Sequence, residues 1–198
     1  MKLAKNIVTT ASLLLLSTAL LGCATPTKPT RERPQWTMHG DGLFIGPGRA
    51  LYGVGIASGI KKKALAHRTA SDRAMAVLGR FMDDFGKSML NTRKEDERKH
   101  TMMRSAEEQD GQAYVDMRRA CNSALYHAGM RVVGRWVDPN DSTFYALARG
   151  EFDTFLGELA KNREYSRRDH EYFAKNAERV FNTVAGKHAK GYTEGDWP

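Results

Sequence analysis

Hydrophobic and small residues alternate along residues 51–57, which indicates a β-strand with large side chains on one face and Gly53 and Gly55 on the other. In residues 60–85 the hydrophobic residues recur at three- and four-residue spacing, which predicts a helix. Gly86 follows and is expected to end the helix in a left-handed conformation. The first part of the helical stripe is small, so the helix is expected to pack closely against the sheet. The stripe consists of Ala66, Ala70, Ala74, Val77, Leu78, Phe81 and Phe85.

The next segment, residues 87–111, is dense in charge, and we expect it to be an exposed helical extension or a loop, neither a buried strand nor a fully packed helix. Residues 112–128 again show helical spacing of hydrophobic residues. Gly129 follows at the position that commonly ends a helix. A second helix is therefore predicted there.

Two β-rich runs, residues 131–137 and 143–149, flank residues 138–141, whose Asp-Pro-Asn-Asp sequence is typical of a turn. This arrangement predicts a β-hairpin. Asp153 is then expected to cap a short third helix that runs through Asn162.

The last part of the chain carries its own helix signal. Ser166 and Asp169 have capping-box spacing, and Gly186 is expected to end the helix. Its hydrophobic stripe is narrow and must cover either the open sheet face of the same chain or another protein. The stripe consists of Phe173, Ala177, Val180, Phe181 and Val184.

The composition is that of a globular protein: 198 residues, 41% of them hydrophobic and 27% charged. A mean hydropathy of −0.55 is too polar for a multi-span membrane protein. The hydrophobic fraction is too high for a disordered chain.

The first residues have the order of a bacterial lipoprotein signal. Lys2 and Lys5 precede an apolar run at residues 11–21, and a Leu-Leu-Gly sequence leads to Cys23. The resemblance to the lipobox implies cleavage before Cys23, lipidation of its thiol and acylation of its new amino group, for example with palmitate. Ala24 in place of an aspartate implies sorting to the outer membrane, on either its periplasmic or its surface side. An uncleaved membrane anchor is the alternative.

The chain is thus expected to divide into four parts. A proline-rich tether of about 3.1 Å per residue lifts the folded domain up to about 30 Å from the membrane. The parts are the signal peptide, 1–22; the lipidated cysteine and tether, 23–35; the α+β domain, 36–162; and a helical C-terminal tail, 163–198. The domain's predicted fold class is α+β, a small antiparallel sheet with helices packed on one face.

Net charge changes with export, because loss of Lys2 and Lys5 lowers it from +8 to +6. Nucleic acid is then not expected as a partner. Lipopolysaccharide, anionic lipid and peptidoglycan are the polyanions of an envelope, and solubility alone is the alternative explanation of the excess charge.

The second cysteine, Cys121, has no intramolecular disulfide partner once Cys23 is lipidated. It shares a helical face with small and apolar residues, which favours a buried core position. A reactive thiol or an intermolecular bridge is the alternative.

Sequence motifs for catalysis or cofactors are absent or incomplete. The glycines of residues 53–59 do not have dinucleotide-loop spacing, and residues 138–142 lack the glycine and glutamate of a calcium loop. The six histidines are scattered, and no G-x-S-x-G elbow occurs. We therefore expect no enzyme activity, no cofactor, no metal and no catalytic residues.

Several segments together resemble the Lpp-twenty family of outer-membrane lipoproteins over residues 34–162. The resemblance implies a compact α+β domain without catalysis, multimerisation, and in some members a flagellar or motility-assembly role. The charged residues 91–108 and the helical tail depart from the family pattern. The segments that carry the resemblance are Pro34-Gln35-Trp36, Tyr52-Gly53-Val54-Gly55 with the alanine-rich helix after it, residues 131–139 and residues 144–149.

The function expected from these observations is a non-catalytic structural or assembly role in the cell envelope, through self-association or docking on an envelope protein. The expected interaction surface consists of Trp136 and Tyr145 on the hairpin and Phe173, Val180 and Phe181 on the tail. The alternative is a periplasmic ligand-binding regulator, or an enzyme acting on peptidoglycan or lipid.

Overall fold

The computed structural model describes residues 32–100, 107–163, 165, 167–193 and 197. The chain divides into two units, Met1–Glu32 and Arg33–Pro198, and the fold below is that of the second unit. The expected signal peptide, Cys23 and most of the tether lie outside the described residues.

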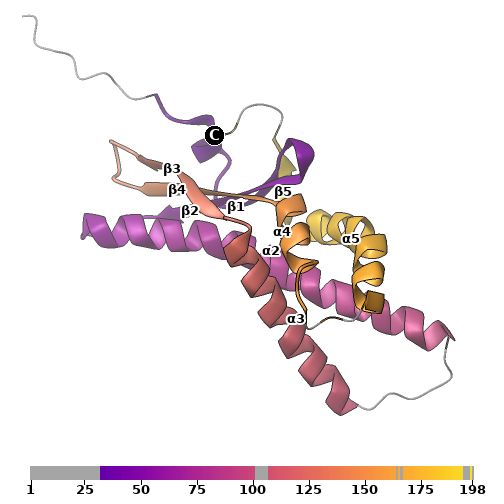
Figure 1. Ribbon diagram of the computed structural model, residues 1–198. Helices are drawn as coiled ribbons and strands as arrows, with labels where there is room; N and C mark the ends of the chain where they lie inside the picture. The colour runs from indigo at the N-terminus through magenta and orange to yellow at the C-terminus, as the bar shows by residue number, and fades with distance from the viewer. Residues whose placement is uncertain (1–31, 101–106, 164, 166, 194–196, 198) are drawn as a thin grey trace, which may run out of the picture. The chain divides into compact units, whose positions relative to one another are not determined.

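The described residues form four α-helices and a five-stranded mixed sheet (Figure 1). This confirms the α+β class. In chain order the elements are η1 (Gln35–Met38), β1 (Gly42–Ile45), η2 (Pro47–Arg49), β2 (Ala50–Ala57), α2 (Lys63–His100), α3 (Glu107–His127), β3 (Arg131–Val137), β4 (Phe144–Glu151), α4 (Phe152–Leu159), α5 (Arg167–His188) and β5 (Ala189–Tyr192).

The strand order in the sheet is β3-β4-β2-β1-β5. The predicted hairpin is confirmed as the antiparallel pair β3 and β4, and β4 pairs antiparallel with β2. The expectation of a purely antiparallel sheet is wrong, because β5 lies parallel to β1 at the edge. The chain reaches this position through α5, which continues directly into β5.

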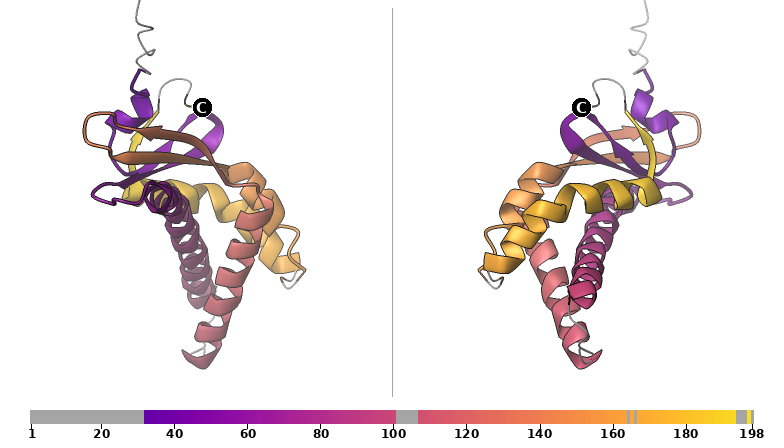
Figure 2. Two further views of the ribbon diagram at one scale, coloured as in Figure 1. Left: turned by 90° about the vertical axis from the view of Figure 1, so that its left-hand side faces the viewer. Right: turned by 90° about the vertical axis from the view of Figure 1, so that its right-hand side faces the viewer.

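Side-chain alternation divides the sheet into two faces. Leu51 and Ala57 of β2 pack in the main core together with residues from all four helices. Tyr52 and Val54 point the other way, into a smaller core to which no α-helix contributes among the described residues. Figure 2 shows the helices on one side of the sheet and the η1 segment on the other.

The strand glycines let α2 lie directly on the sheet. A Cβ atom on Gly53 would lie 2.3 Å from the carbonyl oxygen of Ala74, and one on Gly55 would lie 2.2 Å from that of Ala70. Ala70 and Ala74 are themselves buried. The predicted close packing of a small-residue helix on a glycine-bearing strand is confirmed.

Gly86 does not end the helix. Helix α2 continues past it to His100, 38 residues in all. A Cβ atom at this position would lie 2.9 Å from the Sγ of Cys121 on α3. The glycine therefore allows close approach of two helices, which is a tertiary reason that the local sequence does not reveal.

The segment 87–111 is helical wherever it is described, as α2 to His100 and α3 from Glu107. Its beginning is not merely an exposed extension, because Met89 and Leu90 are buried. The end of the following helix is confirmed, since Gly129 adopts a positive φ of 69° just after α3.

Further helix boundaries differ from those expected, and one of them is the end of α4, which lies at Leu159 and not at Asn162. Asp153 lies in the first turn of α4 and does not cap it; the N-cap is Glu151, and Asp153 pairs with Arg49. Gly186 lies inside α5, which continues to His188. Ser166 lies outside the described residues, and its expected capping partner Asp169 pairs with Arg93 of α2.

Candidate functional site

The five side chains expected to form an interaction surface are buried within the second unit. Trp136 and Tyr145 are each 8% exposed, and Phe173, Val180 and Phe181 are 6%, 2% and 4% exposed. The expectation of an exposed apolar surface at these residues is therefore corrected.

Each group has its own cover within the chain. The tail helix packs on the helical side of the sheet, where the Phe181 ring lies 5.6 Å from that of Phe81 and 4.3 Å from that of Phe152. On the other side, Trp36 lies over Gly134 in β3, and the Trp197 ring lies 5.3 Å from that of Tyr52. The tail helix thus packs within its own chain, but against α2 and α4 on the helical side; it does not cover the open sheet face, as the first alternative had expected.

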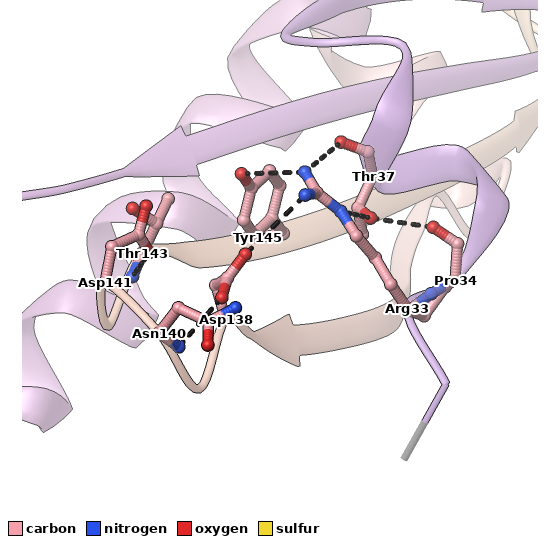
Figure 3. A network of polar contacts seen from close by, with 8 residues as sticks. All are labelled: Arg33, Pro34, Thr37, Asp138, Asn140, Asp141, Thr143 and Tyr145. Carbon is pink, nitrogen blue, oxygen red and sulfur yellow. Dashed lines mark hydrogen bonds and ion pairs between the residues drawn. The ribbon is translucent and has the colours of Figure 1, made fainter. Parts of the chain in front are cut away.

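Arg33 joins the end of the tether to the domain (Figure 3). Its Nε donates to the Thr37 hydroxyl at 3.1 Å, and its Nη2 donates to the Tyr145 hydroxyl at 3.3 Å. The Thr37 hydroxyl in turn donates to the carbonyl oxygen of Pro34 at 2.7 Å. Three elements, the tether, η1 and β4, therefore meet at one guanidinium group.

An aromatic pair supports the same guanidinium. Its central carbon lies 5.4 Å from the ring centre of Trp136 and 5.6 Å from that of Tyr145. The two aromatic residues face each other across β3 and β4, with ring centres 5.5 Å apart. Arginine favours such a position, because its planar cation stacks on aromatic rings while its edge donates hydrogen bonds.

A carboxylate at the hairpin turn completes the arrangement. Asp138, whose side chain is 10% exposed, lies 3.6 Å from Nη1 of Arg33 and accepts the backbone N–H of Asn140 at 2.9 Å. Next in the turn, Asp141 accepts the backbone N–H of Thr143 at 2.8 Å, and this hydrogen bond lowers the pKa of Asp141 below its usual value. The carboxylates thus hold the turn in the shape that meets Arg33.

We call Arg33, Thr37, Trp136, Asp138 and Tyr145 the tether clamp. Its hydrogen bonds, ion pair and ring contacts hold Arg33 at the turn end of the β3–β4 hairpin. The clamp thus connects Arg33 to the end of β3, an edge strand of the sheet, and to β4 beside it.

A second feature is a cavity of about 430 Å³ between α3 and α4. The two helices pack against each other (Figures 1 and 2). The lining is mostly polar and rich in cations, and consists of Arg119, Ala120, Ser123, Ala124, His127, Glu158, Lys161, Asn162 and Arg163.

Cys121 is 2% exposed, which confirms its predicted burial. Removal from water, and to a smaller degree the nearby charge of Asp83, raises the pKa of its thiol to about 12. A thiol is a poor nucleophile under these conditions, because the thiolate is the reactive form.

Among the residues that the structure describes, no group of three or more histidine, cysteine, aspartate or glutamate side chains is placed to hold a metal ion. Likewise, within that part of the chain no helix has the length and hydrophobicity needed to span a bilayer.

Sequence reasoning assigned Arg33 to the tether and missed its role in the clamp. A usable signal was its position, since it is the cation nearest to Trp36 in the segment that leads into the first folded turn. The cavity residues gave no such signal, because Arg119 and Arg163 come together only through the packing of α3 on α4.

Comparisons with known proteins add no relative: no protein-family model matches the chain, and neither the curated proteins nor the solved structures yield a match.

Proposed function

We propose that this protein is a lipoprotein anchored to the outer membrane through Cys23, with a non-catalytic structural or assembly role in the cell envelope. The observation that carries the proposal is the order of Lys2 and Lys5, the apolar run and the Leu-Leu-Gly-Cys sequence. Several acyl chains on one cysteine hold a protein to a bilayer far better than a single chain does.

The tether clamp supports this proposal. Only ten positions separate Cys23 from Arg33, so an extended tether of about 3.1 Å per residue spans about 30 Å. Because Arg33 is hydrogen-bonded to Thr37 and Tyr145, the tether is expected to attach to the domain at a defined residue. A defined point of attachment is useful where a domain must present one face to a neighbour.

The face that we propose for docking is the outer surface of α3. Val115 is 46% and Tyr126 84% exposed. They lie eleven residues apart, so they share a helical face at a separation of about 16 Å. Exposed aromatic residues are frequent anchors of protein interfaces. The partner is a second copy of the chain or an envelope protein, and the resemblance to Lpp-twenty lipoproteins makes a motility assembly the first one to examine.

In vivo photo-crosslinking tests the docking role. A photo-reactive amino acid replaces Tyr126 in the full chain, and the matched control replaces Arg68, an equally exposed residue of α2. We expect a discrete crosslinked band, recovered with the outer membrane, from position 126 and none from position 68. Equal crosslinking from both positions, or none from either, contradicts docking through α3.

A ligand-binding regulator is the second candidate, and the α3–α4 cavity favours it. Its volume of about 430 Å³ falls in the range of small-molecule sites, about 300–1,000 Å³. This candidate is compatible with the same lipid anchor.

A further inference from the structure

We propose that the cavity between α3 and α4 binds a small anionic ligand that carries a phosphate group, such as a phosphorylated sugar or the headgroup of a phospholipid. The inference rests on the second candidate function and supplies its ligand class. It does not depend on acylation of Cys23.

Charge is the first argument. Arg119, Lys161 and Arg163 line the cavity, and Glu158 is the single carboxylate in the lining. These groups give the cavity a net charge of +2. His127 also lines it and adds a hydrogen-bond donor.

The existing ion pairs leave part of this charge available. Lys161 is paired with Glu158 at 2.6 Å, and Arg119 lies 3.5 Å from Asp116, one turn away on α3 and outside the lining. Arg163 has no ion pair within the described part of the chain. An arginine side chain at a cavity wall is suited to bidentate contact with phosphate oxygens.

Shape and neutral polar groups are the second argument. Ala120 and Ala124 leave room on the α3 side, while Ser123 and Asn162 add polar side chains to the walls. Polar groups at the walls of a site fix the orientation of a small molecule, and in this cavity they form most of the lining. The volume of about 430 Å³ accommodates a sugar ring as well as a phosphate.

The helix ends themselves do not attract an anion. The cavity lies at the carboxyl ends of α3 and α4, where the helix dipole is negative. At the end of α4, the carbonyl oxygens of Leu156, Glu158 and Leu159 already accept backbone hydrogen bonds. Binding therefore depends on the cationic side chains, and this makes it sensitive to single substitutions.

Isothermal titration calorimetry of the full chain, purified in a neutral detergent, tests the inference. The probes are glucose 6-phosphate and glycerol 3-phosphate, the latter standing for a phospholipid headgroup, with glucose and glycerol as neutral controls. We expect both phosphates to bind and neither neutral compound to bind. The tighter of the two phosphates then identifies the source of the ligand.

Three variants locate the binding. Arg163→Gln is expected to weaken phosphate binding about tenfold, because it removes a charge-assisted hydrogen bond. Glu158→Gln is expected to tighten it several-fold, since it removes the only negative lining group and releases Lys161. Arg68→Gln, at an exposed site on α2, serves as the control and leaves binding unchanged.

A merely structural role of Glu158 cannot tighten binding, so this variant decides the matter even if Arg163→Gln lowers stability. The inference is overturned if neither phosphate binds at about 10 mM, or if Arg163→Gln and Arg68→Gln weaken binding equally. Those results do not bear on the lipid anchor or on the docking role. The anchor is tested by mass spectrometry of Cys23, and docking is tested by crosslinking.

Discussion

At the scale of single residues, Gly53 and Gly55 determine how near α2 lies to the sheet. A side chain at either position would clash with the backbone of the helix, because an added Cβ would lie 2.3 Å or 2.2 Å from a carbonyl oxygen of α2. A backbone atom cannot move aside as a flexible side chain does. The two glycines on the face of β2 that meets α2 are therefore as necessary to the fold as the large residues on its other face.

Gly55→Ala is predicted to destabilise the protein by about 3 kcal/mol or more, because the added methyl forces α2 away from the sheet. Gly79→Ala is the matched control, since Gly79 lies inside α2 with nothing within 4 Å of an added Cβ. This second change should stabilise the helix by up to about 1 kcal/mol. Urea unfolding measures both, and equal effects of the two variants would argue against close packing.

The thiol of Cys121 gives a prediction for alkaline pH. Its pKa is raised from 9.0 to about 12 in the folded protein, so above pH 9 the unfolded chain binds fewer protons than the folded one. The contribution of the protonated Cys121 thiol to the free energy of unfolding is thus fully present below pH 9, and it is lost as the pH rises toward 12. The loss approaches about 1.4 kcal/mol per pH unit.

Cys121→Ala should remove this contribution to the alkaline loss. The pKa of Tyr172 is also raised to about 12, chiefly by burial, but this group is present in both proteins and cancels in the comparison. Unfolding free energies measured between pH 8 and pH 11 check the prediction. The same pH dependence in both proteins would show that the thiol titrates normally in the folded state.

At the scale of elements, the contact of α2 with α3 depends on Gly86. The residue sits against Cys121 and Met117, and an added Cβ would lie 2.9 Å from Sγ and 3.2 Å from the Cγ of Met117. Two long helices can approach closely here only because one of them lacks a side chain at this point.

Gly86→Ala should therefore destabilise the wild-type protein, whereas the same change in a Cys121→Ala background should be neutral or stabilising. Removal of the sulfur makes room for the methyl group, and alanine favours the helix by about 1 kcal/mol over glycine. A double-mutant cycle of unfolding free energies gives the coupling. Additive effects of the two changes would place the residues out of contact.

The tether clamp gives a second prediction at this scale. Arg33→Gln removes the charge that bonds Thr37 and Tyr145 and lies over the ring of Trp136. We expect the amide of Thr37, which donates to Pro34, to exchange with solvent about tenfold faster. Arg68→Gln, on an exposed part of α2, should leave that exchange rate unchanged. Unchanged exchange in Arg33→Gln would show that η1 holds without the clamp.

Local patterns predicted the elements that are determined locally. The strand at residues 51–57, the hairpin and the helix ended by Gly129 rest on alternation, turn residues and helical spacing, and the structure contains all of them. The failures concern Gly86 and Gly186, which were interpreted as helix ends. Both lie inside helices, because a glycine in a helix is tolerated when tertiary packing supports it.

Contacts between distant parts of the chain could not be predicted in this way. The parallel pairing of β5 with β1 joins residues 189–192 to residues 43–45, and no local signal specifies it. The cover of the outer sheet face by Trp36 and Trp197 is of the same kind. For this reason Trp136 and Tyr145 were expected on the surface although they are buried.

At the scale of the whole molecule, we propose that residues 24–32 and the tether clamp join a lipid-anchored cysteine to the folded domain. The length of the tether limits the domain to about 30 Å from the bilayer. The proposed docking role of α3 in the envelope depends on this anchor, whereas ligand binding by the α3–α4 cavity does not. Cleavage before Cys23 and acylation of this residue are thus the central claim.

Mass spectrometry of the amino-terminal peptide, from the native protein extracted from its own membrane, tests this claim most directly. We expect a chain that begins at Cys23 and carries the mass of a diacylglycerol group and an amide-linked acyl chain. A chain that begins at Met1, or a Cys23 without lipid, would contradict this claim.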